Sequence, residues 1–202
     1  MSFEWPTPPF NMLISGITGC GKTHFVLDLI QHKYRNKFDY IVILCPTFIY
    51  NKTYNRPFIY KDSSIIPMPI NDKLNSVLQE ISNKFSDPKE HTLILLDDCA
   101  NLHDAKMKST ALTKLAFHGR HSNISCWVIT QKYNAIVKDF RQNIQVLVFF
   151  YDKDKKSRDA AFEENDIGIT PAEKNDIVRH LKTVKNSKLI MKLSHPFTYV
   201  LM

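Results

Sequence analysis

The sequence predicts an α/β domain with a mostly parallel central sheet and helices on both of its faces. Apolar runs typical of buried strands alternate along the chain with segments whose apolar residues repeat at helical spacing. The chain has 202 residues and is 44% hydrophobic, which suffices for one domain with a sizeable core. We expect a single domain over residues 1–202, with a core over 8–150 and a C-terminal extension over 151–202.

The first strand is expected at residues 10–15, and a glycine-rich loop follows it. Residues 16–23 read Gly-Ile-Thr-Gly-Cys-Gly-Lys-Thr, a complete G-x-x-x-x-G-K-[ST] phosphate-binding motif. The apolar residues between 25 and 30 then fall on one stripe of a helix, so the motif has the strand–loop–helix context that it requires. Glycines leave backbone N–H groups free to wrap a phosphate, and a helix N-terminus favours negative charge. We therefore expect the chain to bind a nucleoside triphosphate.

Within this motif, each residue type has an expected task. Lys22 is expected to reach the β- and γ-phosphates, and Thr23 to ligate Mg²⁺. A glycine-rich turn with a chance lysine is the alternative, which the complete motif and its flanks disfavour. The residues expected to contact ATP are those of the motif and the one after it: Gly16, Ile17, Thr18, Gly19, Cys20, Gly21, Lys22, Thr23 and His24.

The next elements run from residue 40 to residue 85. A second strand is expected at 40–45, because its apolar run ends at Pro46. Residues 47–68 form a long aromatic and polar connection without clear periodicity, and such connections are usually functional or disordered. Asn71 is then expected to cap a helix whose apolar residues over 74–85 keep helical spacing.

Three more strands, two more helices and a terminal hairpin complete the expected order. Strands are expected at 92–96, 124–130 and 144–150, with a helix around 105–117. Residues 152–158 are charged and resemble a surface linker. Thr170-Pro171-Ala172-Glu173 is a capping box that opens a helix with Ile177, Val178, Leu181 and Val184 facing inward, and 188–193 with 197–202 predict a terminal hairpin.

The third strand ends in two adjacent aspartates. A carboxylate at the carboxyl end of a buried strand beside a phosphate loop can hold Mg²⁺, usually through a water, and this predicts a metal role for Asp97. Asp98, one residue further on, is placed to orient or deprotonate the attacking water. An acidic turn after a strand is the alternative for both residues.

Two residues around the fourth strand are further candidates. Gln131 closes that strand and can hydrogen-bond the γ-phosphate or the attacking water, although a polar residue at a strand end is as common. Arg120 precedes the strand and is either a solvated charge or an arginine finger, which stabilises transition-state charge on a neighbouring subunit's nucleotide.

Composition indicates which kind of partner the protein binds and in which cellular compartment it works. The formal net charge of +7 suggests a polyanionic partner, nucleic acid first, although a solvated basic surface would give the same balance. The four cysteines are scattered without a C-x-x-C pair, so single thiols in a reducing compartment are expected rather than a zinc site. The sequence shows no signal peptide and no apolar run of membrane-spanning length. We expect an intracellular protein.

These motifs, in this order, resemble those of a known family. They are similar to the viral genome-packaging ATPases of the FtsK–HerA superfamily, specifically the poxvirus-type branch that also occurs in Polinton/Maverick elements and virophages. The resemblance spans about residues 10–150. The residues that carry it are Gly16–Thr23, Leu93–Asp98, Gly119-Arg120-His121 with Ile124-Ser125, Thr130-Gln131, and Arg141-Gln142-Asn143.

The resemblance implies a RecA-like P-loop fold, with the fourth strand inserted between the first and the third. It also implies that Lys22 and Thr23 bind phosphate and Mg²⁺, that Asp97 coordinates the metal, that Asp98 supports hydrolysis, that Gln131 senses the phosphate and that Arg120 acts in trans. Many relatives in the wider superfamily have glutamate after the metal-binding aspartate, whereas this chain has the shorter Asp98.

The implied activity is ATP-driven translocation of double-stranded DNA into a capsid in an infected cell, in a cytoplasmic factory or the nucleus. Subunits would form a ring, a hexamer being expected, and capsid proteins are further candidate partners. Candidates for DNA contact are Lys106, Lys108, Lys132 and Lys138, although a solvated surface is the commoner role of each lysine.

Two other functions remain open from the sequence. One is a P-loop nucleoside or nucleotide kinase, although residues 152–158 contain one arginine and make a weak lid. The other is a slowly hydrolysing, nucleotide-dependent binding switch.

Overall fold

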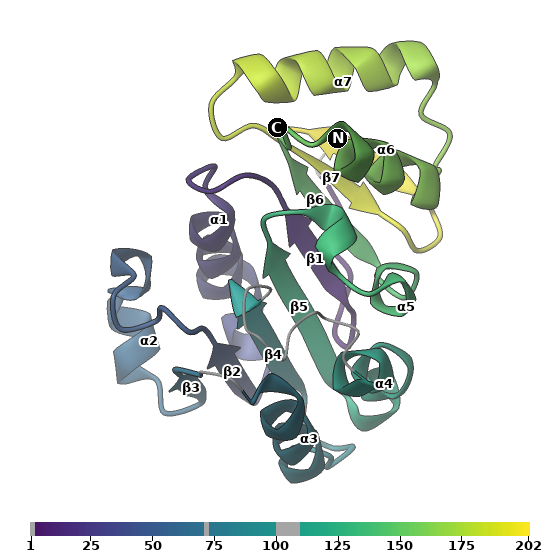
Figure 1. Ribbon diagram of the computed structural model, residues 1–202. Coiled ribbons are helices and arrows are strands. Elements are labelled where there is room, and N and C mark those ends of the chain that lie inside the picture. The colour runs from purple at the N-terminus through teal and green to yellow at the C-terminus, as the bar shows by residue number, and fades with distance from the viewer. Residues whose placement is uncertain (1–2, 71–72, 100–109) are drawn as a thin grey trace.

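The computed structural model describes residues 3–70, 73–99 and 110–202 (Figure 1). Within these residues, eight strands form one sheet in the order β3-β2-β4-β5-β1-β6-β7-β8. The first six strands in this order pair in parallel, and β7 and β8 are antiparallel additions at one edge. The strands are β1 Met12–Ser15, β2 Tyr40–Leu44, β3 Ile65–Met68, β4 Thr92–Asp97, β5 Ile124–Thr130, β6 Val146–Phe150, β7 Lys188–Lys192 and β8 Thr198–Leu201.

The predicted strand order is confirmed, with β5 as the predicted fourth strand and β4 as the predicted third strand. β5 lies between β1 and β4, with Ser15 opposite Thr130 on one side and Asp97 opposite Ile129 on the other. Because these strands are parallel, their carboxyl ends meet at one edge of the sheet. That edge carries the loop after β1, the two aspartates at the end of β4 and the glutamine after β5.

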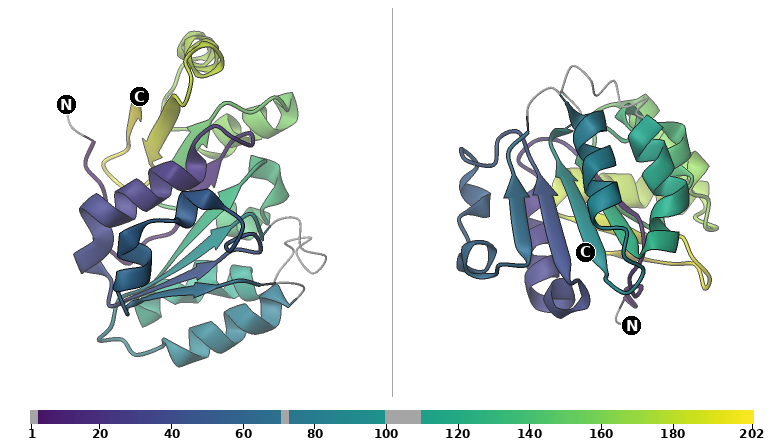
Figure 2. Two further views of the ribbon diagram at one scale, coloured as in Figure 1. Left: turned by 90° about the vertical axis from the view of Figure 1, so that its left-hand side faces the viewer. Right: turned by 90° about the horizontal axis from the view of Figure 1, so that it is seen from below.

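Helices cover both faces of the sheet (Figure 2). Helices α1 (Lys22–Leu29) and α2 (Pro57–Lys61) bury their apolar residues on one face, and a π-helical turn over Ile30–Tyr34 continues α1. The other face is covered by α3 (Leu74–Lys84), α4 (Thr110–His118), α5 (Lys138–Arg141), α6 (Lys155–Glu164) and α7 (Pro171–Thr183). Among the described residues, no helix is both long and apolar enough to cross a lipid bilayer.

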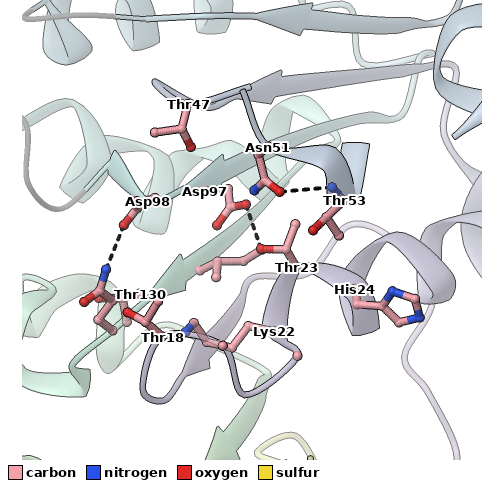
Figure 3. A pocket seen from close by; sticks show the side chains of 14 residues that line it. Thr18, Lys22, Thr23, His24, Thr47, Asn51, Thr53, Asp97, Asp98 and Thr130 are labelled. Atoms are coloured by element: carbon pink, nitrogen blue, oxygen red, sulfur yellow. Dashed lines mark hydrogen bonds between the residues drawn. The ribbon is translucent and has the colours of Figure 1, made fainter. Parts of the chain in front are cut away.

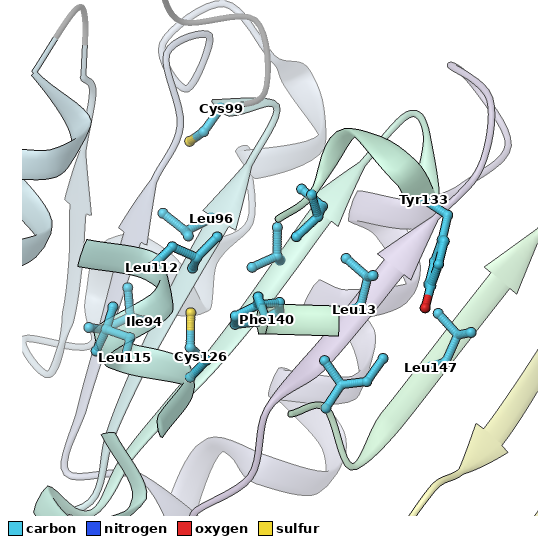
Figure 4. Close-up of a cluster of buried hydrophobic side chains, with 14 of the residues drawn as sticks. Leu13, Ile94, Leu96, Cys99, Leu112, Leu115, Cys126, Tyr133, Phe140 and Leu147 are labelled. Atoms are coloured by element: carbon cyan, nitrogen blue, oxygen red, sulfur yellow. The ribbon is translucent and has the colours of Figure 1, made fainter. Parts of the chain in front are cut away.

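Side chains of each strand alternate between two apolar clusters. In β4, Leu93 and Leu95 join the cluster beneath α1, whereas Ile94 and Leu96 join the cluster beneath α3 and α4 (Figure 4). Strands buried on both faces need apolar residues at every position, which explains the continuous apolar runs that predicted them. The sheet therefore forms a rigid base for the polar loops at its carboxyl edge.

The expectation of an irregular connection over 47–68 is wrong in part. The segment contains a 3-10 turn at Lys52–Tyr54, helix α2 and the edge strand β3, which pairs in parallel with β2. β3 is only four residues long and includes Pro67. Proline is tolerated on an edge strand, where one side of the backbone needs no partner, but it removes the usual sequence sign of a strand.

The interpretation of residues 152–158 as a surface linker is also wrong. Asp152 is buried, and α6 begins at Lys155 with the Asp154 side chain accepting a hydrogen bond from the Lys156 N–H. This N-cap gives a charged sequence a helical start that periodicity alone does not reveal.

The C-terminal predictions are largely confirmed. Thr170 and Glu173 form the capping box at the start of α7, and β7 and β8 form the hairpin. Ile177 and Leu181 are buried as predicted, but Val184 is exposed because it lies just beyond the last helical residue. The predicted cap Asn71 lies outside the described residues. So do residues 105–109 of the helix that was predicted around 105–117.

Candidate active site

The glycine-rich loop connects β1 to α1 at the carboxyl edge of the sheet. Gly19 and Gly21 have φ angles of +78° and +94°, in the left-handed region that favours glycine. A Cβ atom on Gly16 would lie 2.5 Å from Cβ of Phe150, whereas one on Gly19 would meet no heavy atom of the described residues within 4 Å. Gly16 therefore lets the loop pack closely on β6, and Gly19 lies against open space.

Lys22 is the first residue of α1, and its side chain folds back along the loop. The ammonium group donates hydrogen bonds to the backbone carbonyls of Gly16 (2.7 Å) and Ile17 (2.8 Å). The residue is buried, so its positive charge lies within the loop rather than in bulk solvent. The helix N-terminus adds its positive end at the same place. The loop is thus built to attract a phosphate.

Asp97, the last residue of β4, receives two hydroxyl hydrogen bonds. Its Oδ2 accepts a hydrogen bond from Thr23 Oγ1 at 2.9 Å (Figure 3). The same oxygen accepts one from the Tyr54 hydroxyl at 2.5 Å. Burial raises the pKa of Asp97, while the hydrogen bonds from Tyr54 and Thr23 oppose that rise. The structure thus joins the two residues that the sequence predicts as metal ligands.

Asp98 turns away from the strand and meets Gln131. Its φ of +55° is left-handed, a conformation that aspartate adopts more readily than most residues and that is common at functional sites. Gln131 Nε2 donates a hydrogen bond of 3.2 Å to Asp98 Oδ1. The residues that follow β4 and β5 are therefore paired across the edge of the sheet.

These groups surround a cavity of about 350 Å³ (Figure 3). Gly16, Ile17 and Cys20 lie in the loop but are not among the residues that line it. The lining residues are Thr18, Gly19, Gly21, Lys22, Thr23, His24, Thr47, Asn51, Thr53, Asp97, Asp98, Ile129, Thr130 and Gln131.

One wall of this cavity comes from a segment for which the sequence predicted no specific role. Thr47, Asn51 and Thr53 line the cavity, and Tyr54 contacts Asp97 from behind it. The length of the connection without periodicity was a sign of function, but no residue pattern within it marked these side chains.

A second cavity of about 460 Å³ adjoins the loop on the side of β6 and the C-terminal hairpin. It shares Gly19, Gly21 and His24 with the first cavity. Its other lining residues are Phe25, Asp28, Phe150, Lys185, Asn186 and Lys188.

Lys188 is the most unusual of these residues. Its ammonium group lies 5.2 Å from the ring centroid of Phe25 and 5.8 Å from that of Phe150. Burial lowers the pKa of Lys188. This cavity thus combines aromatic surface with a cation beside the phosphate loop.

The oxygen donors at Thr23 and Asp97 fit Mg²⁺. Magnesium prefers hard oxygen ligands and keeps several waters, so a protein site needs only one or two side chains beside the substrate phosphates. A hydroxyl and a carboxylate held 2.9 Å apart beside an open cavity meet this requirement.

Arg120 is not brought together with these residues. It is exposed in the 3-10 turn Gly119–Ser122, which precedes β5 and so lies at the amino edge of the sheet. Lys132 and Lys138 are exposed, and Lys132 lies 3.9 Å from Asp154. Lys106 and Lys108 lie outside the described residues.

The comparison with protein families decides the family. The model of the "Poxvirus A32 protein" family matches residues 5–193. The chain belongs to this family. Membership in the A32 family confirms the resemblance to the poxvirus-type packaging ATPases. No curated protein sequence matches the chain.

Solved structures share the fold of this A32 family member. The genome packaging NTPase B204 from Sulfolobus turreted icosahedral virus 2, in complex with AMPPCP, aligns with a TM-score of 0.70 at 15% identity, over 97% of this chain and 98% of that chain. B204, the DNA-packaging ATPase from Sulfolobus turreted icosahedral virus, gives 0.70 at 14% identity over the same shares. The pCW3 conjugation coupling protein TcpA gives 0.60 at 13% identity, over 94% of this chain and 59% of that chain.

Proposed function

We propose that this chain is a Mg²⁺-dependent ATPase that drives the packaging of double-stranded DNA into a viral capsid. The observation that carries the proposal is the single cavity that brings together the phosphate loop, Asp97, Asp98 and Gln131. Membership in the A32 family and the fold shared with a packaging NTPase solved with AMPPCP support it.

In this proposal the loop binds the triphosphate. Backbone N–H groups of the loop and the N-terminus of α1 hold the phosphates, and Lys22 exchanges its carbonyl partners for phosphate oxygens. Thr23 and Asp97 hold Mg²⁺. When bound, Mg²⁺ supplies positive charge that offsets the charge developing on the phosphate oxygens.

Hydrolysis would be assisted from the opposite wall of the cavity. Asp98 accepts a hydrogen bond from a water and aligns it with the γ-phosphorus, taking a proton as the water's oxygen bonds to phosphorus. The bond between the γ-phosphorus and the bridging oxygen breaks, giving ADP and inorganic phosphate. Gln131, already bonded to Asp98, is placed to hold the carboxylate and to sense the γ-phosphate.

The second cavity would hold the nucleoside part of ATP. It adjoins the first through Gly19, Gly21 and His24, so a nucleotide can extend from one to the other. Phe25 and Phe150 offer apolar surface to a base, and Lys188 offers a cation to the ribose or the α-phosphate.

DNA handling would require several copies of the chain. We propose a homo-oligomeric ring, a hexamer, with Arg120 of one subunit completing the nucleotide site of the next. Basic side chains, with Lys132 and Lys138 as the described candidates, would contact the phosphate backbone without reading sequence. The setting would be intracellular, where viral DNA meets capsid proteins.

A phosphate-release assay on Lys22→Ala tests the hydrolase at this site. We expect wild-type protein to release inorganic phosphate from ATP with Mg²⁺, and Lys22→Ala to lose turnover. Lys33→Ala, which removes an exposed lysine just beyond α1, should retain it. Unchanged turnover in Lys22→Ala would contradict the site, and transfer of phosphate to an added nucleoside would favour a kinase.

A further inference from the structure

We propose that Tyr54 is a positioning residue that fixes the Asp97 carboxylate for Mg²⁺, and that segment 47–57 is thereby part of the metal site. This inference rests on the proposed function, because it gives Asp97 a metal to hold. Tyr54 lies in the connection after β2, far in sequence from both the phosphate loop and Asp97.

The contact itself is short and shielded from solvent. The Tyr54 side chain is 0% exposed, and its hydroxyl donates to Asp97 Oδ2 at 2.5 Å. The same oxygen accepts the hydrogen bond from Thr23 at 2.9 Å. Two hydroxyls on different elements, α1 and the 52–54 turn, therefore fix one carboxylate oxygen. A carboxylate held this way cannot rotate without breaking a buried hydrogen bond, which is costly.

Tyr54 is itself held firmly on both sides. The Asn51 side chain accepts a hydrogen bond from the Thr53 N–H (3.0 Å) and caps the turn that carries Tyr54. The ring of Phe48 packs against that of Tyr54 with centroids 4.7 Å apart. Arg56 donates a hydrogen bond of 2.6 Å to Asp28 on α1. The turn is thus tied to the helix that starts at the phosphate loop.

This arrangement has a specific consequence for metal binding. Groups that orient a metal ligand typically contribute about 10- to 100-fold to metal affinity, although they do not touch the metal. Tyr54 should therefore affect how strongly Mg²⁺ tightens nucleotide binding. It should not affect binding of the nucleotide without metal, because Tyr54 is not among the residues that line the cavity.

The test uses Tyr54→Phe, which removes only the hydroxyl and keeps the ring packing. Tyr34→Phe is the matched control, because Tyr34 is buried in the same apolar cluster and its hydroxyl donates to the Pro6 carbonyl, away from the cavity. The probe is a fluorescent, non-hydrolysable ATP analogue, whose dissociation constant is measured in EDTA and in Mg²⁺. Mn²⁺ binding to the nucleotide complex, followed by electron paramagnetic resonance, gives a second readout.

We expect wild type, Tyr54→Phe and Tyr34→Phe to bind the analogue equally in EDTA. The Mg²⁺ enhancement, which is the factor by which Mg²⁺ tightens analogue binding, should fall about 10- to 100-fold in Tyr54→Phe alone. In an Asp97→Asn background, Tyr54→Phe should cause no further loss, since Tyr54 acts through Asp97. Equal Mg²⁺ enhancement in wild type and Tyr54→Phe would overturn the inference. The inference would also be overturned if Tyr54→Phe bound the analogue more weakly than wild type by the same factor in EDTA and in Mg²⁺, because that result would indicate a purely structural role.

Failure of wild type to bind the analogue and failure of Tyr54→Phe to fold have different meanings. If wild-type protein binds no analogue, the proposed function fails, and the inference fails with it. If urea denaturation shows that Tyr54→Phe does not fold, Phe48→Leu takes its place, because it removes the ring that packs on Tyr54 and Phe48 is not among the residues that line the cavity. A smaller Mg²⁺ enhancement of analogue binding in Phe48→Leu would support the inference, and an unchanged enhancement would overturn it.

Discussion

Two adjacent aspartates with the same chemistry have very different surroundings in this chain. Asp97 is buried and accepts hydrogen bonds from two hydroxyls, which suits a carboxylate that must stay in place. Asp98 is half-buried, has a left-handed backbone conformation and meets the amide of Gln131. The backbone reversal at Asp98 separates the two carboxylates, so that a fixed one and a more accessible one can face the same cavity.

Asp98→Asn should bind ATP as wild type does and lose hydrolysis. The change keeps the shape of the side chain and its partner Gln131, but removes the group that accepts a proton from water. A positioned acid or base typically contributes about 100- to 10,000-fold to the rate. Parallel binding and phosphate-release measurements test this, with Asp176→Asn on the exposed side of α7 as the control. Wild-type turnover in Asp98→Asn would place the base elsewhere.

At the scale of elements, the turn after the C-terminal helix and the start of the hairpin line the second cavity beside the phosphate loop. α7 packs Ile177 and Leu181 on the sheet, and the turn after it carries Lys185 and Asn186 to the second cavity. Asn186 has a φ of +60°, so this turn is a tight one. Loss of α7 from the sheet would therefore disturb both the core and a wall of the second cavity.

Thr170→Ala should reduce the free energy of unfolding by about 1 kcal/mol, because it removes the N-cap of α7. The Thr170 hydroxyl accepts a hydrogen bond from the Glu173 N–H, and the Glu173 carboxylate accepts one from the Thr170 N–H. Urea denaturation measures the loss, and Thr170→Ser, which keeps a capping hydroxyl, serves as the control. If alanine and serine variants unfold at the same urea concentration as wild type, the cap does not stabilise the fold.

Strong local signals made much of the fold predictable from sequence. Buried parallel strands such as β4 and β5 require apolar residues at every position, and the capping box of α7 satisfies backbone groups with specific side chains. β3 was missed because it is a short edge strand containing Pro67. Helix α6 was missed because its N-cap, Asp154, and its first turn lie in a charged run that resembles a linker.

The residues of the candidate site were predictable only where a local sequence motif marks them. Five residues of the phosphate-loop motif and the two aspartates at the end of β4 line one cavity, since parallel strands bring their carboxyl ends together. Tyr54, Asn51 and Lys188 reach the site through tertiary packing, so no local spacing marks them. Their contribution follows from the positions of β2 and β7 in the sheet.

At the scale of the whole molecule, the candidate residues lie at two opposite edges of the sheet. The cavity is at the carboxyl edge, whereas Arg120 precedes β5 at the amino edge. β5 has seven residues, so it separates Arg120 from Gln131 by on the order of 20 Å. An exposed arginine at this distance can act on a nucleotide only if another subunit presents its cavity there.

Arg120→Ala should bind ATP almost normally and hydrolyse it about a thousandfold more slowly, as expected for loss of an arginine finger. Arg179→Ala, which removes an exposed arginine of α7, should keep wild-type turnover. Mixing Arg120→Ala subunits with Lys22→Ala subunits should restore some activity, because an intact loop can then face an intact arginine. If mixed rings form and no activity returns at any ratio, Arg120 does not act between subunits.

The proposed packaging function is tested most directly by measuring the ATPase rate with and without duplex DNA. A packaging motor should hydrolyse ATP faster with double-stranded DNA of any sequence. The stimulation should weaken steeply as salt increases, because binding to the phosphate backbone releases counterions. We therefore expect DNA to stimulate the ATPase in a way that is sensitive to salt and independent of DNA sequence. An ATPase rate that duplex DNA leaves unchanged at low salt, and that an added nucleoside acceptor increases, would contradict the proposed packaging function.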